Sequence, residues 1–555
     1  MNNPPNDPYL VGAQRMRDPL LNRGSAFTHE ERERFSLEGL LPAGVSDQSS
    51  QSARVQNTLR SLHEPLAKYR ELMALQDLNE YLFYRVLIDH LSELMPIVYT
   101  PTVGEAAQKF SDVFQRGRGL WITPAHKGRM REVIATALGA REIQLLVVTD
   151  NESILGLGDQ GAGGMTISIG KLALYTACAG IAPETTLPIS LDFGTNNPKL
   201  LGSRTYLGWP AKRLEGKEYA ELIEEFVVAV EALFPFALVQ WEDFRKDNAL
   251  RILDRYRERI LSFNDDIQGT GAVTLAGVYS GLRIAGRKLT DQRILIYGAG
   301  AAGLGIARQI KAALRMADVP EDQLQRHIGV LDSRGVLVDQ GSFADAYKHE
   351  LAWSPAWAEE LGIGEDRSLE RTVEAFRATV LIGTSGQGGA FTERIVRAMA
   401  GFAHRPIIMP LSNPTDNAEA TPNDLVRWTE GRALVATGSP FEPVTFHGET
   451  KHIGQGNNVF IFPALGMASL VCGAKMVTDN MITRSAQALA EQLLPHELED
   501  GLLYPSVSRL RAVTRNVTLA VIEQAIEDGV ASVQSDRTPK ELLEAASWSP
   551  EYKAL

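Results

Sequence analysis

The feature that most constrains the fold is a glycine-rich turn between a strand pattern and a helix pattern. The apolar run 293–297 predicts a strand, Gly298, Gly300 and Gly303 follow it directly, and a helix pattern continues over 304–316. In this context the glycines allow a tight turn, and the helix N-terminus can hold a pyrophosphate. The sequence therefore predicts a Rossmann-type dinucleotide-binding domain; a purely structural glycine turn is the alternative.

An acidic residue at the end of the next strand supports this interpretation. Asp332 follows the predicted strand 328–331, where a carboxylate can bind a ribose hydroxyl. It lies farther from the glycines than is usual, so we expect a long first helix and an inserted loop over 317–326. Asp332 favours NAD, whereas Arg334 could pair with the 2′-phosphate of NADP. We expect NAD, with NADP as a weaker cofactor.

The same glycine spacing occurs earlier, at Gly156, Gly158 and Gly161. No strand leads directly into this segment and no helix leaves it directly, so the pattern alone is weak evidence for a nucleotide site. We interpret 156–164 as a loop whose backbone lies near a substrate or cofactor.

Two acidic motifs suggest a metal site. Glu242 and Asp243 follow the apolar run 236–239, which predicts a buried strand, and Asp265 and Asp266 follow Asn264. Carboxylates without Cys or His suit a hard cation such as Mg²⁺ or Mn²⁺. The alternative is a helix N-cap with surface charge.

Bulk properties narrow the class of protein. The 555 residues exceed one hydrophobic core, so two or three domains are expected. The net charge of −12 argues against nucleic acid and an anionic membrane surface as partners. Cys178 and Cys472 lie in apolar surroundings and are expected to be buried thiols in a reducing cytoplasm. We find no signal-peptide pattern and no run of ~18 apolar residues.

The pattern along the chain predicts an α/β protein with a helical N-terminal region, an α/β catalytic domain and a Rossmann-type domain. Residues 1–25 are expected to form an extended arm, and 28–95 to form helices that end at Met95-Pro96. Further strands are predicted at 144–148, 187–192, 380–383 and 406–409, and helices at 172–179 and 219–233. The expected division is 1–125 (arm and helical region), 126–275 (first part of the catalytic domain), 276–459 (dinucleotide-binding domain), 460–535 (return to the catalytic domain) and 536–555 (tail).

Several segments together carry a family resemblance. Besides the acidic motifs, they are Pro96–Pro101, Gly156–Gly161, Gly170–Ala177, Leu411–Thr415 and Gly454–Asn458. This ordered set, from about residue 35 to about residue 530, resembles the malic enzyme family. The resemblance implies NAD-dependent oxidation of L-malate to pyruvate and CO₂, a divalent metal, and a homodimer or homotetramer.

The resemblance also implies roles for individual residues. Glu242, Asp243 and Asp266 would bind Mg²⁺ or Mn²⁺. Lys171, expected at the start of an apolar helix where burial would lower its pKa, would be the general base with Asp265 as its partner. Tyr99 would protonate C3 of the enol. From the residues alone, Lys171 could equally be a snorkelling lysine and Tyr99 a packed turn aromatic.

Asparagines and one serine complete the expected site. Asn413 and Asn458 would bind substrate carboxylate or carboxamide oxygens, and Asn413 and Asn457 would also contact the cofactor. Asn413 precedes a proline, which restricts its backbone to an extended form. Ser153 would face the substrate.

Ser153 is also the main departure from the family pattern, because an arginine that pairs with malate usually stands there. Thr166–Ile169 likewise lacks the usual Gly-Ile-Pro. Both departures, and weakly Trp241 and Gly271, resemble malolactic enzymes, which form lactate and CO₂ and retain NAD. Segment 437–440 and the asparagine motifs resemble malic enzymes proper, which we favour. A non-catalytic NAD-binding regulator is the remote alternative. By position only, the cations that could replace the arginine are Arg129, Arg131 and Arg141.

Overall fold

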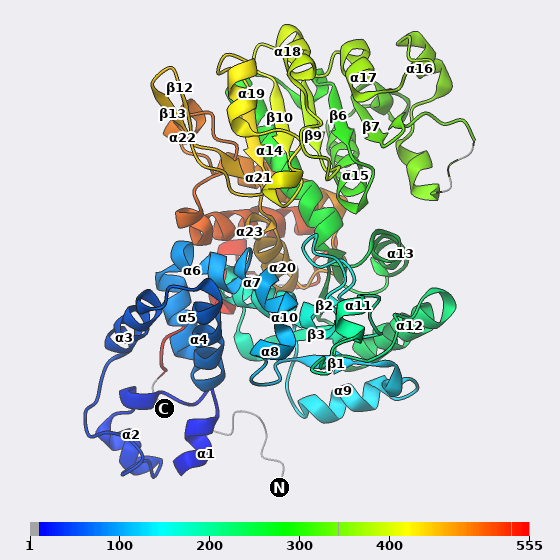
Figure 1. Cartoon of the computed structure of the whole chain (residues 1–555). Coiled ribbons are helices and arrows are strands. Elements are labelled where there is room, and N and C mark those ends of the chain that lie inside the picture. The colour runs from blue at the N-terminus through cyan, green and yellow to red at the C-terminus, as the bar shows by residue number, and fades with distance from the viewer. Residues whose placement is uncertain (1–9, 342, 344, 534–535, 554–555) are drawn as a thin grey trace. The chain divides into compact units, whose positions relative to one another are not determined.

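The computed structural model describes residues 10–341, 343, 345–533 and 536–553, so residues 1–9 of the expected arm lie outside the described part. The chain forms two compact units (Figure 1). Unit 1 comprises Met1–Phe244, Ile260–Ser262 and Lys540–Leu555, and unit 2 comprises Arg245–Arg259 and Phe263–Pro539. The chain thus passes between the units at 244/245, 259/260, 262/263 and 539/540.

Unit 1 begins with helices, which were predicted over 28–95; the prediction of an extended arm over 1–25 is wrong where α1 forms. They are α1 Gly12–Arg17, α2 His29–Arg34, α3 Gln48–Ser61, α4 Pro65–Leu78, α5 Glu80–Asp89, α6 Leu91–Val98, α7 Thr102–Gln108 and α8 Phe110–Val113. Thr28, Asp47 and Asn79 cap three of them with side-chain hydrogen bonds. The predicted end at Met95-Pro96 is wrong, because α6 continues through Pro96 to Val98. Burial of Ile97 and Val98 offsets the hydrogen bond that the proline removes.

A five-stranded sheet follows in the order β1-β3-β2-β4-β5. Its strands are β1 Leu120–Ile122, β2 Leu145–Thr149, β3 Thr186–Leu191, β4 Leu238–Glu242 and β5 Ser262–Asn264. The pairs β1–β3, β2–β3 and β2–β4 are parallel. The predicted strand at 236–239 is shifted, since Phe236 is 87% exposed and the buried strand starts at Leu238. Glu242 is therefore the last strand residue.

Helix α10 Met165–Leu174 packs on β2 and β3, and it continues as a π-helical turn, Tyr175–Ala179. The predicted helix at 172–179 is therefore real but begins at Met165, so Lys171 lies in the second half of α10 and not at its start. The remaining helices of the sheet region are α9 Met130–Leu138, α11 Pro198–Leu201 and α12 Gly216–Leu233.

The last segment of the chain also belongs to unit 1. Trp548 is buried there, its backbone amide donates to the carbonyl of Gly180 at 2.7 Å, and its ring lies 5.5 Å from that of Tyr84. The hydroxyl of Tyr552 accepts a hydrogen bond from Asn79 at 2.8 Å. Residues before α10 are thus held by residues after the whole of unit 2.

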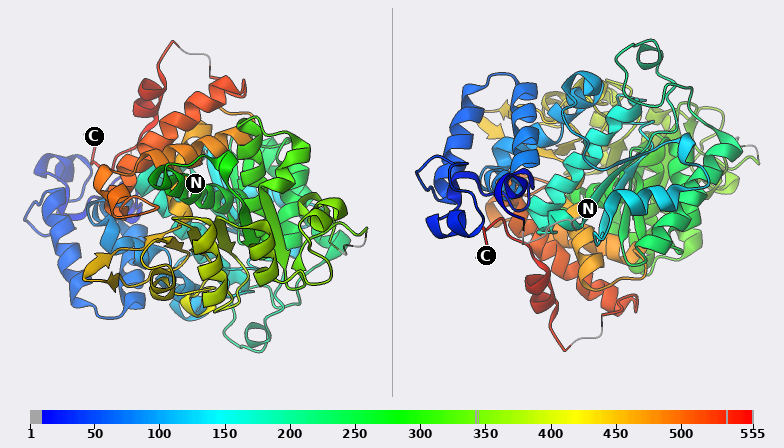
Figure 2. Two further views of the ribbon diagram at one scale, coloured as in Figure 1. Left: turned by 90° about the horizontal axis from the view of Figure 1, so that it is seen from above. Right: turned by 90° about the horizontal axis from the view of Figure 1, so that it is seen from below.

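Unit 2 contains a seven-stranded sheet in the order β14-β11-β10-β9-β6-β7-β8. Its strands are β6 Ile294–Tyr297, β7 Ile328–Asp332, β8 Gly335–Val336, β9 Val380–Gly383, β10 Ile407–Pro410, β11 Leu434–Thr437 and β14 Gly454–Gln455. Only β7 and β8 pair antiparallel among these strands. From above, helices lie on both faces: α14 and α21 on one, α18 and α19 on the other (Figure 2). The Rossmann-type arrangement is confirmed.

The other elements of unit 2 surround this sheet or precede it. They are α13 Lys246–Tyr256, α14 Thr270–Ala285, α15 Ala301–Met316, α16 Pro355–Glu360, α17 Leu369–Phe376, α18 Glu393–Phe402, α19 Pro422–Trp428, α20 Phe462–Val471, α21 Asp479–Glu491, α22 Pro495–Glu499, α23 Leu510–Glu527 and the hairpin β12 Val444–Phe446 with β13 Glu449–Lys451. Helix α24, Pro539–Ala546, begins at the last boundary. None of the helices in the described ranges has the length and apolar character needed to cross a bilayer.

Candidate active site

A buried ion pair lies at the centre of the candidate site in unit 1. Lys171 projects from α10, and its Nζ lies 2.8 Å from Oε1 of Glu242 at the end of β4. The two side chains are 1% and 2% exposed. Because burying a lone charge is very costly, each group makes the burial of the other tolerable. The structure thus joins the predicted base to one predicted metal ligand, while pairing of Lys171 with Asp265 stays a prediction.

Tyr99 lies beside the lysine. It follows α6 directly, and its ring centre is 5.5 Å from the Lys171 Nζ. The neighbouring Gly170 makes this approach feasible, because a Cβ there would lie only 2.5 Å from the carbonyl oxygen of Val98. Sequence reasoning found Gly170 only as part of a motif; its close contact with another helix has no local sequence signal.

The loop after β2 contacts the acidic motif of unit 1. The backbone amide of Ser153 donates to the carbonyl of Asp243 at 3.0 Å, and the amide of Leu155 donates to its Oδ2 at 3.2 Å. Asp243, Asn151 and Leu155 all have positive φ angles, of 56°, 67° and 47°. Such strained non-glycine residues cluster at functional sites. The backbone of Ser153 therefore lies beside the predicted metal ligand Asp243, while its contact with the substrate stays a prediction.

Arg213 and Asp159 form a second buried ion pair, which the sequence analysis missed. Arg213 Nη2 lies 2.8 Å from Oδ1 of Asp159, and its Nη1 donates to the carbonyl of Asp150 at 2.6 Å. Burial lowers the pKa of Arg213, but the charges of Asp150 and Asp159 hold it above its ordinary value. The pair anchors the 151–164 loop. Asp159 lies in a recognised motif, whereas nothing local marks Arg213.

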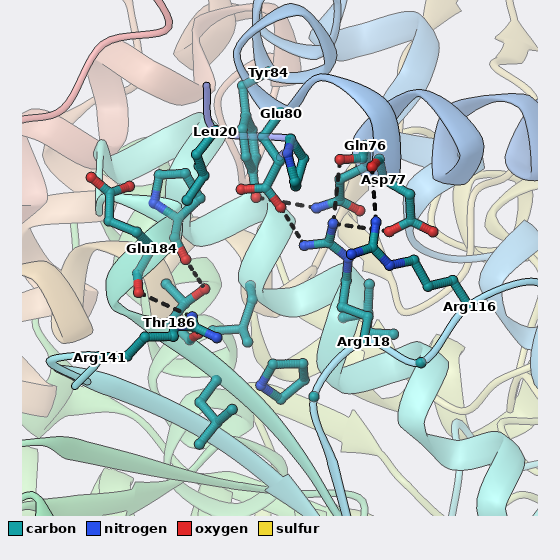
Figure 3. A pocket seen from close by; sticks show the side chains of 18 of the residues that line it. Leu20, Gln76, Asp77, Glu80, Tyr84, Arg116, Arg118, Arg141, Glu184 and Thr186 are labelled. Carbon is teal, nitrogen blue, oxygen red and sulfur yellow. Dashed lines mark hydrogen bonds and ion pairs between the residues drawn. The ribbon is translucent and has the colours of Figure 1, made fainter. Parts of the chain in front are cut away.

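Arg141, one of the cations expected near Ser153, lies at the opposite end of the sheet. Its Nη2 donates to the carbonyls of Glu184 and Thr186 at 3.0 and 3.1 Å (Figure 3). Thr186 is the first residue of β3, whereas Ser153 follows the carboxyl end of the parallel strand β2. The five-residue strand spans about 16 Å, beyond the reach of an arginine side chain. The prediction that Arg141 could replace the missing arginine near Ser153 is therefore wrong. Arg129 and Arg131 are exposed.

Arg141 instead lines a cavity of about 310 Å³ with Arg118, Glu80 and Glu184 (Figure 3). Arg118 pairs there with Asp77, with Oδ1 at 3.1 Å, and with Glu80. None of the predicted site residues lines this cavity. It is therefore separate from the candidate site.

The glycine turn of unit 2 has the predicted geometry. Gly298 follows β6 with φ +127°, and a Cβ there would lie 2.5 Å from the backbone of Thr384. A Cβ at Gly303 would lie 1.8 Å from the carbonyl oxygen of Gly298. Gly300 is the N-cap of α15, and nothing lies within 4 Å of the place where its Cβ would be. The turn thus leaves backbone N–H groups accessible to a pyrophosphate, and this geometry fits a dinucleotide.

Asp332 ends β7, as predicted, but its carboxylate already has partners. Lys348 Nζ lies 2.6 Å from Oδ2, and the amide of Arg334 donates to Oδ1 at 2.7 Å. Burial raises the pKa of Asp332, but the hydrogen bonds from Lys348 and Arg334 hold it below its ordinary value. Lys348, in a turn after the strand, was missed because no motif marks it.

The predicted asparagines are engaged with neighbours in unit 2. Asn458 Nδ2 donates to Oδ2 of Asp265 and to Oγ1 of Thr270, each at 3.1 Å. Asn457 caps the turn Asn458–Phe460 by accepting from the amide of Val459 at 3.0 Å. Asn413 is exposed and accepts from the hydroxyl of Ser439. The structure thus brings Asn458 to the predicted partner of the base.

Asp265 and Asp266 open a π-helical turn, Asp265–Gly269. Asn264 caps this turn, since its Oδ1 accepts from the amide of Ile267 at 2.9 Å. Asp265 is fully buried and Asp266 is half-buried. The alternative interpretation of this motif as a cap with surface charge is therefore only partly right: Asn264 is the cap, and the aspartates are not surface charges.

Two family models match the chain. One, described as the malic enzyme N-terminal domain, matches residues 76–257, and the other, described as the malic enzyme NAD binding domain, matches residues 267–526. The NAD-dependent malic enzyme of Photorhabdus laumondii is 45% identical over 536 residues, 96% of this chain and 95% of that protein. The enzyme of the same name from Acinetobacter baylyi is 43% identical over 549 residues, 98% and 96% of the two chains.

A solved structure agrees at the level of the fold. The crystal structure of Entamoeba histolytica malic enzyme superposes with a TM-score of 0.57 at 22% identity, covering 92% of this chain and 90% of that one. The sequence relatives cover nearly the whole length of this chain. The chain belongs to the malic enzyme family.

Proposed function

We propose that this protein oxidises L-malate with NAD and releases pyruvate and CO₂, with the help of a divalent metal. The observation that carries the proposal is the buried contact of Lys171 with Glu242, next to Tyr99. A proton acceptor, a hydroxyl donor and a hard-cation ligand are the groups that this reaction requires. The names of the relatives, NAD-dependent malic enzyme, support the same reaction and cofactor.

The metal ligands in this proposal are Glu242, Asp243 and Asp266. All three are carboxylates, which suits Mg²⁺ or Mn²⁺, and they follow or end the strands β4 and β5. Such strand ends are where α/β sheets bind ligands. A bound metal would supply Lewis-acid stabilisation of charge on the C2 oxygen of the substrate.

Side chains of the protein carry the proton transfers. Lys171 takes the proton from the C2 hydroxyl, and Asp265 is its proposed partner; bound NAD would supply the hydride acceptor. After CO₂ is lost, Tyr99 donates a proton to C3 of the enol. Asn413 and Asn458 bind oxygens of the substrate or of the cofactor carboxamide. Asn457 contributes to cofactor binding through the backbone turn that it caps.

Ser153 keeps the malolactic reaction as a second candidate. A serine hydroxyl offers one neutral hydrogen bond where an arginine would contribute on the order of 1.5–3 kcal/mol. Arg141 cannot replace it, and Arg213 is already held by Asp159. The asparagine motifs resemble those of malic enzymes proper, so we expect the malic reaction.

The product distinguishes the two reactions. With enzyme, malate, Mn²⁺ and NAD, we expect NADH to accumulate in a one-to-one ratio with CO₂. Absorbance of NADH is followed while lactate is assayed in the same mixture. Stoichiometric lactate without net NADH would replace our proposal with the malolactic one.

Cofactor choice follows from Asp332 and Lys348. We expect a higher kcat/KM for NAD than for NADP, because Asp332 repels a 2′-phosphate. Lys348 partly neutralises that carboxylate, so Lys348→Met should lower kcat/KM for NADP about tenfold or more, in line with one charged hydrogen bond. The value for NAD should change little.

Arg334→Met is the matched control for Lys348→Met, since Arg334 is 75% exposed and lies 3.9 Å from Asp332. It should have the smaller effect on NADP. Equal kcat/KM values for NADP in the parent and in Lys348→Met would contradict this account.

We further propose a cytoplasmic homodimer or homotetramer without nucleic-acid or membrane partners. Both cysteines are buried, and burial raises the pKa of the Cys472 thiol to about 11, as expected for structural thiols in a reducing location. The acidic net charge of −12 disfavours nucleic acid. The particle mass in solution, against 60.8 kDa for one chain, measures the oligomeric state.

A further inference from the structure

The candidate metal ligand Glu242 belongs to a hydrogen-bonded network of four side chains, Lys171, Glu242, Gln240 and Tyr175. Gln240 and Glu242 are two residues apart on β4 and therefore project from the same face of the strand. Lys171 and Tyr175 are four residues apart on α10 and its π-helical extension, so they share one face of that helix. The two faces meet inside unit 1.

Hydrogen bonds join the four residues in order. Lys171 Nζ lies 2.8 Å from Glu242 Oε1, and Gln240 Nε2 donates to Glu242 Oε2 at 2.7 Å. The hydroxyl of Tyr175 donates to Gln240 Oε1. Each carboxylate oxygen of Glu242 thus has one donor within the network.

The hydrogen-bonding chemistry of the network fixes the orientation of the Gln240 amide. A carboxylate only accepts hydrogen bonds, so the NH₂ group of Gln240 must point to Glu242 and its oxygen must point to Tyr175. The carboxylate of Glu242 prevents the amide from flipping, because a flipped amide would place its oxygen against a carboxylate oxygen, and both are acceptors. Glu242 therefore has one defined carboxylate plane.

The side chains of this network are shielded from water. Tyr175 and Gln240 are fully buried, and Glu242 and Lys171 are nearly so. On the other face of β4, Trp241 packs edge-on against Phe226 and Phe244, which holds the strand in register. Because water is excluded, the loss of one hydrogen bond of the network leaves a buried donor or acceptor unsatisfied.

We propose that Gln240 and Tyr175 are positioning residues that hold the carboxylate of Glu242 in the orientation required for divalent-metal binding. This inference rests on the proposed function, because it takes Glu242 as a ligand. Partners of metal ligands commonly change metal affinity about 10- to 100-fold when they are removed. Gln240 acts directly on Glu242, and Tyr175 acts on Glu242 through Gln240.

The test measures Mn²⁺ binding to the metal-free protein, without turnover, by electron paramagnetic resonance of free Mn²⁺. Gln240→Met should weaken binding about 10- to 100-fold, because it keeps the length of the side chain and removes its hydrogen bonds. Tyr175→Phe removes one hydroxyl and should weaken binding less, by about three- to tenfold. In the double variant, Tyr175→Phe should add nothing to Gln240→Met, because its route to Glu242 is already broken.

Kinetics give an independent readout. If Tyr175 only positions the ligand, excess Mn²⁺ should restore kcat of Tyr175→Phe while its KM for Mn²⁺ stays raised. Tyr84→Phe is the matched control, since Tyr84 is also buried in unit 1 and accepts a hydrogen bond from Gln76, which is not part of the network. It should bind Mn²⁺ like the parent.

Glu242→Gln separates the two levels of the proposal. If it loses Mn²⁺ binding while Gln240→Met and Tyr175→Phe bind within twofold of the parent, the positioning inference is overturned and the metal site stands. If Glu242→Gln binds Mn²⁺ as well as the parent, Glu242 is not a ligand and the proposed metal set fails with it. Additive losses in the double variant would also overturn the ordered route from Tyr175 through Gln240.

Discussion

Asp266→Asn is expected to lower kcat/KM for malate by about a thousandfold or more and to weaken Mn²⁺ binding. The substitution keeps the size of the side chain and removes the negative charge that a divalent ligand set needs. Asp266 is only half-buried, and Asn264 caps the turn that contains it. The fold should therefore persist, with the melting temperature within about 2 °C of the parent.

Steady-state rates over a series of Mn²⁺ concentrations, together with calorimetry, measure both effects. Asp322→Asn is the control, because Asp322 is an exposed aspartate in the first turn of another short helix of unit 2. It should have parental activity. Full activity of the parent protein in excess chelator would refute a metal-dependent reaction.

Replacement of Lys171 and Tyr99 should produce two different defects. Lys171→Ala should lower the rate of malate oxidation by about 10²- to 10⁴-fold, the usual contribution of a general base. Tyr99→Phe should still decarboxylate oxaloacetate but form pyruvate from the enol slowly. Partial reactions with malate and with oxaloacetate separate the two steps.

The burial of Lys171 complicates its removal, because Glu242 would lose its counter-ion at a cost of about 3–5 kcal/mol. Lys171→Arg addresses this: it keeps the positive charge near Glu242 but cannot act as a base, since the guanidinium does not deprotonate. Loss of oxidation in both Lys171 variants, at temperatures where both are folded, would assign the defect to the base. Identical defects of Lys171 and Tyr99 variants in every partial reaction would refute the division of roles.

The sequence predicted those parts of the structure that depend on neighbouring residues. The turn from β6 through Gly298 to α15 was predictable because strand, glycines and helix follow one another within a few residues. The same holds for Asp332, which the end of a strand positions. The fold class followed from the alternation of such local patterns.

Errors arose where local patterns were ambiguous. The apolar run around Phe236 looks like a strand, yet the pairing of β4 with β2 starts at Leu238 and leaves Phe236 in solvent. The start of α10 was missed because Thr166 and Ser168 resemble loop residues, although both are buried in the helix. In each case tertiary packing decided the boundary.

Long-range partners of the site had no local signal. Lys348 meets Asp332 across an intervening strand and turn, and Arg213 meets Asp159 from another part of unit 1. The network through Gln240 and Tyr175 becomes visible only when α10 is placed against β4. The sequence motifs identified the predicted reacting groups, whereas the residues that orient these groups could be identified only from the structure.

The discontinuity of unit 1 has a consequence for biosynthesis. The segment containing Trp548 and Tyr552 completes the packing around Tyr84 and Asn79, yet it is translated after the whole of unit 2. A ribosome therefore exposes the helices around Tyr84 long before their last contacts exist. During translation the N-terminal unit therefore stays incompletely packed until the segment with Trp548 and Tyr552 can dock on it.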